Sequence, residues 1–282
     1  MMKIGLYRRR GSASAQGDST GIPTDAQVDE LLAMLRRNGV EPSIVDDRLP
    51  STEGLDFVLS LGGDGTLLSL VHLMQRQDVP IVGINYGHLG FLTTGSPANL
   101  DTLVSDLIEG RFTIEDRTLL RVEVEPTEST LKTEPTFVLN EVYVHRKGHS
   151  SLLHTDLFIE DDYVATYKAD GLIVATPTGS TAYSLSCGGP ILTPTSGCFV
   201  ITPVAAHTLT LRPIIVPDSA RLRLVPRPSR QAYFRLGMDS RSLTLPTGSH
   251  VHLQRAGFTI KLVRLHHQSF YTAIHDKLSW GR

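Results

Sequence analysis

Hydrophobic and polar positions follow two different patterns along the chain, and the change between them falls near residue 118. Before that point, short apolar runs that suit buried strands, such as Asp56 to Leu61 and Ile81 to Ile84, alternate with segments whose apolar residues recur at helical spacing. Two of these helices are expected from about Thr66 to Arg76 and from Pro97 to Glu109. The alternation predicts parallel strands joined by crossover helices.

The first helix has the clearest start signal. Thr24 and Gln27 have the spacing of a capping box, and Gly39 is expected to end the helix. Its apolar face would consist of Val28, Leu31, Leu32 and Leu35. Strands are expected on either side of it, at Lys3 to Tyr7 and at Ser43 to Val45, so we expect this helix to pack on a sheet.

After residue 118, short alternating segments are punctuated by glycine and proline, which predicts a mostly antiparallel β structure. These segments are Leu120 to Val124, Phe137 to His145, Asp156 to Ile159, Leu222 to Val225 and Ile260 to Val263. The final stretch, Phe270 to Trp280, is expected to be helical and to return to the first domain. The prediction is therefore an α/β N-terminal domain, residues 1–118, completed by about 268–282, and a mostly antiparallel β C-terminal domain, residues 119–267.

Composition narrows the class of protein. The chain has 282 residues, of which 40% are hydrophobic and 20% charged, and its net charge of −2 provides no overall field for nucleic acid or a membrane surface. Small molecules are the expected partners. Its two cysteines, Cys187 and Cys198, form no C-x-x-C pair, and neither a signal-peptide core nor an apolar run of membrane-spanning length is present. We expect a cytoplasmic protein.

The run Leu61-Gly62-Gly63-Asp64-Gly65-Thr66 directly follows an apolar strand, and so places a carboxylate among glycines at the end of that strand. Glycines let the backbone approach an anion closely, and the following helix would direct its N-terminal N–H groups at the same place. A carboxylate beside phosphate is unfavourable unless it binds a metal or takes a proton. A second glycine-bearing loop, Asn85 to Phe91, follows the next strand, so both loops are expected to face one crevice.

Two further stretches could carry chemistry. The run from Lys168 to Pro190 is dominated by small and hydroxyl residues, and its Tyr183 offers a flat face for a base. Composition alone slightly favours a structural turn, but the presence of the glycine-flanked Asp64 reverses that preference in favour of a ligand. Asn140 and Glu141 lie in an alternating apolar segment, so one of them should point inward. They could contact a ribose, a base edge or a metal, or form an exposed turn.

Other chemistries have little support in the pattern. The eleven histidines show no H-E-x-x-H or comparable spacing, so we do not expect a zinc site. There is neither a G-x-S-x-G elbow nor a Walker loop, which argues against a serine hydrolase and a P-loop nucleotide hydrolase. The arginine run Arg8 to Arg10 could contact phosphate, although a solvated charge cluster is the simpler interpretation. It precedes a polar, glycine-rich stretch, expected to be a mobile loop, that extends to Gly21.

Together, several of these segments closely resemble the NAD kinase family. The resemblance spans Asp56 to Trp280 and is carried by Gly62 to Thr66, Gly87 to Leu92, Asn140 to Val142 and Asp170 to Pro190. Diacylglycerol, sphingosine and phosphofructo-kinases share the glycine-flanked aspartate, whereas the run Thr176-Pro177-Thr178-Gly179-Ser180-Thr181-Ala182-Tyr183 is specific to this family. The family has an N-terminal α/β domain and a C-terminal β domain.

The resemblance implies roles for individual residues. Asp64 would accept the proton of the 2′-hydroxyl of the adenosine ribose of NAD as ATP transfers its γ-phosphoryl group. The donor phosphates would be held by Gly62, Gly63, Gly65 and Thr66, with Mg²⁺ offsetting their charge. NAD would be contacted by Asp64, Gly65, Phe91, Asn140, Glu141, Ser151, Lys168, Asp170, Thr181, Ala182, Tyr183, Ser184, Leu185, Ser186, Asp239 and Arg241. Arg241 replaces a family glutamine, and His88 stands where many members have Arg or Asn.

The function expected from these implications is that of a cytoplasmic ATP-dependent NAD 2′-phosphotransferase that produces NADP and ADP and forms a homo-oligomer, a dimer or tetramer. Two alternatives remain at the level of sequence: a diacylglycerol- or sphingosine-type lipid kinase, and a non-catalytic dinucleotide sensor. The residue types do not fix whether polyphosphate replaces ATP, whether NADH is accepted, or whether NADP(H) regulates the enzyme.

Overall fold

The computed structural model describes residues 1–9, 21–45, 52–74, 78–87, 90–127, 133–148, 151–228, 232–266 and 269–281. It divides into two compact units, which we treat separately. Unit 1 comprises Met1–Asp116 and Ile260–Arg282, and unit 2 comprises Arg117–Thr259. The chain passes between the units within β5 (Phe112–Glu125) and β16 (His250–Leu265), two long strands that each contribute to both. The sequence-based boundaries, after residues 118 and 267, lie two and eight residues further along the chain.

Unit 1 contains a parallel sheet with strand order β2-β1-β3-β4. The bounds are β1 (Lys3–Arg8), β2 (Glu41–Ile44), β3 (Phe57–Leu61) and β4 (Ile81–Ile84). Beside β4, Leu262 of β16 pairs with Ile81, also in parallel. Every residue of β3 and β4 is buried, as expected for strands covered on both faces. The predicted parallel strands with crossover helices are confirmed.

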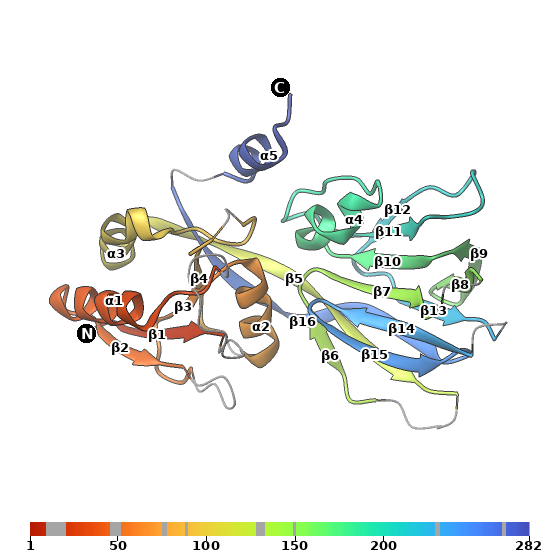
Figure 1. Cartoon of the computed structure of the whole chain (residues 1–282), viewed down its shortest axis with the longest axis horizontal. Coiled ribbons are helices and arrows are strands. Elements are labelled where there is room, and N and C mark those ends of the chain that lie inside the picture. The colour runs from red at the N-terminus through yellow and green to blue at the C-terminus, as the bar shows by residue number, and fades with distance from the viewer. Residues whose placement is uncertain are drawn as a thin grey trace. The chain divides into compact units, whose positions relative to one another are not determined.

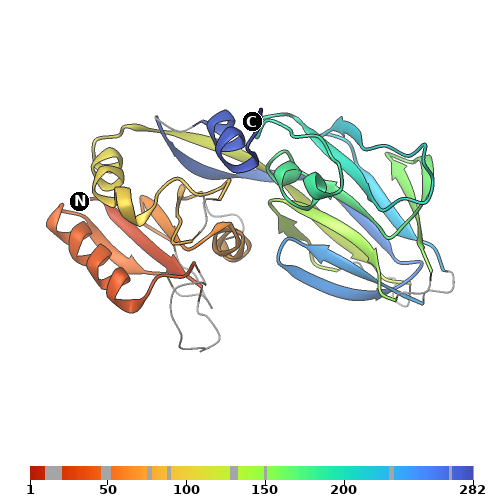
Figure 2. The same ribbon diagram turned by 45° about the horizontal axis from the view of Figure 1, so that its top comes forward.

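The helices of unit 1 are α1 (Asp25–Arg37), α2 (Asp64–Met74), α3 (Leu100–Ile108) and α5 (Phe270–Leu278), and a 3₁₀ turn, η1 (Pro97–Asn99), precedes α3. Helices α1 and α3 lie beside the strands of this sheet (Figures 1 and 2). They share one apolar core with these strands, to which Leu31 and Leu103 contribute together with Leu6 and Leu59. The predicted capping box of α1 is present, with Thr24 and Gln27 bonding each other's backbone N–H.

Unit 2 is built from antiparallel strands, which confirms the predicted change from an α/β structure to a mostly antiparallel β structure. One sheet has the order β12-β11-β10-β7-β14-β15, and a second set of strands runs β16-β13-β8-β9, with β5 paired to β16 and to β6 (Figure 1). The core between them includes Val144, Leu172, Phe199, Leu224 and Leu253. The bounds are β6 (Thr136–Val138), β7 (Glu141–Arg146), β8 (Leu153–Ile159), β9 (Asp162–Ala169), β10 (Gly171–Ala175), β11 (Cys198–Val204), β12 (Ile214–Pro217), β13 (Leu222–Pro226), β14 (Tyr233–Met238) and β15 (Arg241–Pro246).

The hydroxyl-rich stretch after β10 forms two short turns, η2 (Thr178–Thr181) and α4 (Tyr183–Ser186). In the described part of the chain, no helix is both long and apolar enough to span a membrane.

Candidate functional site

Asp64 joins the two glycine-bearing loops of unit 1. Its carboxylate accepts hydrogen bonds from the backbone N–H groups of Phe91, at 2.7 Å to Oδ2, and of Leu92, at 3.1 Å to Oδ1. We expected α2 to begin at about Thr66, but it begins at Asp64, so the carboxylate belongs to the first helical turn. Acidic residues are favoured there, because the first N–H groups of a helix have no partner within it.

Two glycines make this arrangement possible. Gly62 has φ of 151°, a conformation that side chains rarely adopt, and a Cβ there would lie 2.3 Å from Oγ1 of Thr66. A Cβ on Gly90 would lie 1.8 Å from Oδ1 of Asp64. The Asp64 carboxylate therefore occupies the space that a side chain at Gly90 would need.

The predicted phosphate-binding residues differ in accessibility. Apart from the adjoining residues of the chain, a Cβ on Gly63 or Gly65 would meet no described heavy atom within 4 Å, so the backbone is open on that side. Thr66, in contrast, is only 6% exposed, and its side chain packs beneath Gly62. Backbone N–H groups at the start of α2 are thus better placed to receive an anion than the Thr66 hydroxyl is.

Lys277 of α5 is a site residue that the sequence reasoning missed. Its Nζ lies 3.8 Å from the ring centroid of Phe91 and is buried without a hydrogen-bond partner among the described residues. Burial lowers the pKa of Lys277 to about 8, against the opposing influence of the nearby Asp64 charge, while Arg264 lowers it further. The ammonium group of Lys277 therefore places a positive charge beside the Asp64 loop, with no hydrogen-bond acceptor among the described residues.

Two other residues fix Phe91 in place. Arg264 donates from Nη2 to the Phe91 carbonyl at 3.1 Å and from Nε to Glu115 at 3.2 Å. The Phe270 ring lies 6.5 Å from the Phe91 ring, centroid to centroid. Phe270 and Lys277 are seven positions apart, on one face of α5, so that spacing was a signal in the sequence that a lysine lies on an apolar helical face.

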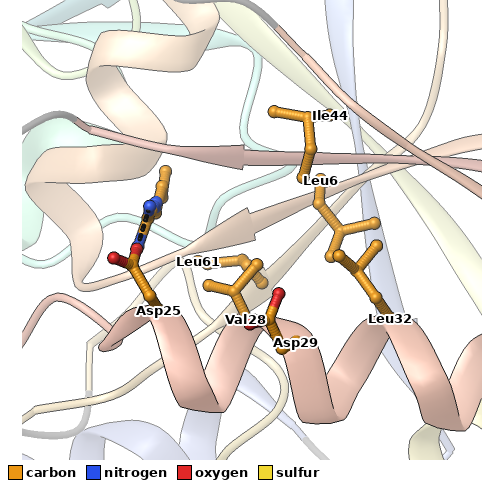
Figure 3. A pocket seen from close by; sticks show the side chains of 8 residues that line it. Leu6, Asp25, Val28, Asp29, Leu32, Ile44 and Leu61 are labelled. Carbon is orange, nitrogen blue, oxygen red and sulfur yellow. Dashed lines mark hydrogen bonds and ion pairs between the residues drawn. The ribbon is translucent and has the colours of Figure 1, made fainter.

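A cavity of about 390 Å³ lies at the carboxyl ends of β1 and β3, against α1 (Figure 3). It is lined by Leu6, Arg8, Asp25, Val28, Asp29, Leu32, Ile44 and Leu61. Arg8 forms a surface ion pair with Asp25, and both interpretations of the arginine run, phosphate contact and a solvated charge cluster, stay predictions. Arg10, most of the expected mobile loop and His88 lie outside the described residues.

In unit 2, Asp239 organises the Asn140-Glu141 turn. Its carboxylate accepts three backbone N–H groups, from Leu139 at 2.8 Å, Asn140 at 2.9 Å and Glu141 at 3.1 Å. Burial raises the pKa of Asp239, and these three hydrogen bonds oppose the increase. Asp239 itself has φ of 49°, and its N–H returns to the Glu141 carbonyl. Both oxygens of Asp239 thus have a structural role.

The same turn presents two buried polar atoms that have no partner among the described residues, Oδ1 of Asn140 and Oε2 of Glu141. Glu141 is 7% exposed, and burial, reinforced by the charge of Asp239, raises its pKa to about 8 against a hydrogen bond from the Tyr183 backbone. Buried polar atoms are normally hydrogen-bonded, so these two adjacent atoms could accept hydrogen bonds from a polar ligand or from water.

The hydroxyl-rich run packs directly on this turn. The Thr176 hydroxyl donates to the Leu139 carbonyl and accepts from Gly179 N–H, while Thr176 N–H donates to the Asn140 carbonyl at 2.9 Å. A Cβ on Gly179 would lie 2.1 Å from that Asn140 carbonyl oxygen. Three segments that are far apart in the sequence, around residues 140, 180 and 239, therefore meet in unit 2.

The side chains of the run point in different directions. Tyr183 is half-buried and packs edge-on against Tyr143 at 5.6 Å between centroids, and burial raises the pKa of its hydroxyl. Ser184 is fully buried and bonds Thr202 at 2.8 Å, so its hydroxyl serves the core. Thr181 bonds the Thr178 carbonyl. The accessible members of the predicted set are Thr181, Ala182, Tyr183, Leu185 and Ser186.

The remaining predicted residues of unit 2 are placed as follows. Asp170 is bound by Arg146, whose Nε and Nη2 lie 2.6 and 3.4 Å from its two oxygens. Lys168 is exposed and Ser151 partly exposed. Arg241 donates to the Thr136 hydroxyl at 3.0 Å and to the Phe137 carbonyl at 3.3 Å, and burial lowers its pKa. Arg241 thus fastens β6, a use of the arginine that the sequence did not indicate.

Comparison with known proteins identifies the family. The family models described as ATP-NAD kinase N-terminal domain and ATP-NAD kinase C-terminal domain match residues 36–112 and 139–265. A NAD kinase of Porphyromonas gingivalis is 42% identical over 237 residues, covering 84% of this chain and 80% of its own. A NAD kinase of Flavobacterium johnsoniae is 36% identical over 300 residues, covering 99% of this chain and 98% of its own.

Two solved structures share the fold. Yeast NADH kinase complexed with NADH superposes with a TM-score of 0.86 at 22% identity, covering 100% of this chain and 88% of the yeast chain. A NAD kinase from Archaeoglobus fulgidus in complex with ATP has a TM-score of 0.76 at 24% identity and covers 99% of both chains. With relatives of 36 to 42% identity over most of its length and both family models matched, the chain belongs to the NAD kinase family.

Proposed function

We propose that this protein transfers the γ-phosphoryl group of ATP to the 2′-hydroxyl of the adenosine ribose of NAD, and that Asp64 is its proton acceptor. The observation that carries the proposal is the position of Asp64, whose carboxylate lies at the first turn of α2 and is held there by the N–H groups of Phe91 and Leu92. The reported relatives are NAD kinases, and they support neither a lipid kinase nor a dinucleotide sensor.

Proton transfer requires a carboxylate that is held in position and still has an acceptor position for the hydroxyl proton. A ribose hydroxyl is too weakly acidic to attack a phosphoryl group unless a neighbouring group takes its proton. Each carboxylate oxygen has two lone pairs, and each oxygen of Asp64 accepts one backbone hydrogen bond from the described residues, which leaves an acceptor position on each as far as these residues are concerned. Asp64 would take the hydroxyl proton as the bond from the γ-phosphorus to the ADP oxygen breaks and the new P–O bond to ribose forms.

The donor phosphates would be received by the start of α2 and by Lys277. The backbone at Gly63 and Gly65 is open, and it lies at the N-terminus of α2, where the helix dipole favours an anion. Gly62 and the side chain of Thr66 pack against each other and so support this loop. The buried ammonium of Lys277 would add a positive charge where charge accumulates on the transferring group.

A divalent ion, Mg²⁺, fits the same loop. Mg²⁺ is commonly bound by substrate phosphates together with one or two carboxylates, and the free acceptor positions on Asp64 provide such a carboxylate. When bound, the ion would neutralise part of the negative charge of the donor phosphates.

Unit 2 would bind the dinucleotide. Oδ1 of Asn140 and Oε2 of Glu141 are suited to the hydroxyl groups of a ribose, and Tyr183 offers an aromatic face. Asp239 would act by holding the turn that carries both residues. The other proposed contacts are Asp64, Gly65 and Phe91 in unit 1, and Ser151, Lys168, Asp170, Thr181, Ala182, Leu185 and Ser186 in unit 2. Ser184, which is buried, and Arg241, which is bonded to β6, would act by supporting these segments.

The direct test is incubation of the purified protein with NAD, ATP and Mg²⁺, followed by an NADP-specific enzymatic readout. Parallel reactions replace NAD with NADH, sphingosine or diacylglycerol, and ATP with polyphosphate, so that acceptor and donor are identified in one experiment. Formation of NADP is expected with NAD and ATP. Phosphorylation of a lipid without formation of NADP would overturn the proposal.

We also propose a cytoplasmic location and a homo-oligomeric state. The two thiols, Cys187 and Cys198, are free, as in proteins of reducing compartments, and the oligomer is an implication of the family resemblance. Fractionation of the source cells and light scattering of the purified protein test these two points separately.

A further inference from the structure

Glu125, His250 and His252 form a cluster in unit 2 to which the proposed reaction assigns no role. Glu125 ends β5, the two histidines begin β16, and these two strands are paired. Residues two apart on a strand project from the same face, so His250 and His252 point the same way. Their imidazoles lie 6.1 Å apart, centroid to centroid.

The potential ligand atoms converge on one point. Nε2 of His252 lies 3.3 Å from Oε2 of Glu125, and Nδ1 of His250 lies 3.9 Å from the same oxygen. The three atoms all lie within 4.8 Å of one another. In a tetrahedral zinc site, bonds of about 2.0 to 2.1 Å place neighbouring ligand atoms roughly 3.3 to 3.5 Å apart. A small rotation of the His250 ring would therefore bring the three atoms to ligand distances.

We propose that Glu125, His250 and His252 bind a divalent transition-metal ion of the zinc class. Two imidazole nitrogens and one carboxylate oxygen are a donor set that suits Zn²⁺, whereas Mg²⁺ and Ca²⁺ prefer oxygen ligands. Three protein ligands leave the fourth position of a tetrahedral ion to water. Zn²⁺ bound here would connect the end of β5 to the start of β16.

Access and charge are consistent with such a site. The side chains of Glu125 and His250 are each 39% exposed and that of His252 is 28% exposed, so an ion can enter from solvent. His252 also lines a cavity of about 220 Å³. The other charged residues that line this cavity are paired: Arg121 with Glu123, and Arg221 with Glu160. Glu125 is the carboxylate that faces the two histidines.

The test is calorimetric titration of Zn²⁺ into tag-free protein that has been dialysed against a chelator, with no nucleotide present. We expect one equivalent of zinc to bind to the wild-type chain, and the affinity to fall by at least about tenfold in both His252→Gln and Glu125→Gln. Co²⁺ replacing Zn²⁺ is expected to give the intense visible absorption of a tetrahedral site in the wild-type protein only.

A matched control is His275→Gln. His275 pairs with Asp276 at 3.1 Å, so it is also an accessible histidine beside a carboxylate, but it belongs to no three-ligand group among the described residues. This variant should keep the wild-type zinc affinity. Circular dichroism and NADP formation in the chelator-treated His252→Gln and Glu125→Gln variants check the fold, because neither residue belongs to the proposed kinase machinery.

Two results would overturn the proposal. Either the wild-type protein binds no zinc and gives no tetrahedral Co²⁺ spectrum, or zinc binds equally well to wild type and to both cluster variants. The Co²⁺ spectrum of the wild-type protein decides the question even if a variant does not fold. None of these readouts depends on kinase activity, so a failure here is distinct from a failure of the proposed phosphotransfer.

Discussion

At the scale of single residues, the position of the Asp64 carboxylate depends on what surrounds it. Two N–H groups orient it, and Gly90 supplies the space it occupies, since a Cβ at that position would lie 1.8 Å from Oδ1. Positioning errors of about 1 Å can reduce enzymatic rates roughly 10²-fold. The proposed site therefore requires glycine at position 90, because any side chain there would displace the Asp64 carboxylate.

We expect Gly90→Ala to lower kcat by about 10²-fold, because the added methyl group displaces the Asp64 carboxylate. Steady-state kinetics of NADP formation measure the effect. The control is Gly257→Ala, since a Cβ at Gly257 has no described heavy atom within 4 Å, and it should keep wild-type turnover. Equal rates for Gly90→Ala and wild type would show that the contact between Gly90 and Asp64 has no part in catalysis.

The raised pKa of Glu141 predicts how the free energy of unfolding depends on pH. Its pKa is raised to about 8 in the folded protein, so between about pH 4.5 and pH 8 the folded state holds a proton that the unfolded state has lost. Its contribution therefore lowers the free energy of unfolding as pH rises through this window, by up to about 5 kcal/mol in total. Glu141→Gln should flatten the pH dependence, as measured by urea unfolding at several pH values.

The comparison variant is Glu160→Gln. Hydrogen bonds from Arg221 lower the pKa of Glu160, so its contribution is complete above its unfolded pKa and is lost only as pH falls below that value. Between pH 5 and 8 this variant should keep the wild-type slope. If Glu141→Gln also keeps that slope, the carboxyl group of Glu141 is not the buried, proton-binding group described here.

At the scale of elements, α5 connects the C-terminal segment to the Asp64 loop. The half-buried face of this helix carries Phe270, Ala273, Ile274, Lys277 and Leu278. Phe270 and Lys277 both contact Phe91, whose N–H group holds Asp64. The helix therefore brings a charge as well as apolar packing to the loop.

We expect Lys277→Met to lower kcat by roughly 10- to 100-fold, because removing the ammonium group removes a charge that would stabilise the transferring phosphoryl group. In wild type, activity should also decline as pH rises through about 8, where Lys277 loses its proton, and this decline should be absent from the variant. The pH profile of kcat distinguishes loss of the ammonium charge from loss of packing, because only the charge produces the alkaline decline. Lys261→Met, which removes a lysine paired with Asp78, should behave like wild type. Retention of the alkaline decline in Lys277→Met would rule out Lys277 as its source.

Elements specified by local sequence were the ones that could be predicted. The capping box of α1 and the buried runs of β3 and β4 depend on neighbours in the chain, and they were found with small boundary errors. The start of α2 was placed two residues late, because glycines at 63 and 65 argue against helix although the first turn tolerates them. Leu32 packs on the core as part of the predicted apolar face of α1, and Met34, which was not predicted, is also buried there. The Glu125 cluster needs the pairing of β5 with β16, which no local pattern reveals.

At the scale of the whole molecule, the motifs indicated the family and both fold types, because the family's glycine and hydroxyl runs are contiguous in the sequence. Which residues of the motifs support the fold and which face a ligand could not be predicted from the sequence in the same way. Ser184 is buried, Asp239 and Arg241 bond the backbone around residues 137–141, and Thr66 supports Gly62. These uses follow from burial and from long-range pairing, whereas the residue types alone suggest ligand contact.

The proposed function depends most on Asp64, and the decisive measurement compares Asp64→Asn with wild type in NADP formation and in NAD binding. Removing the proton acceptor should lower kcat by about 10² to 10⁴-fold, while the Kd of NAD, measured by calorimetry, stays within about threefold because unit 2 supplies most of the proposed contacts. A folded Asp64→Asn protein that forms NADP at close to the wild-type rate would contradict the assignment of Asp64 as the base.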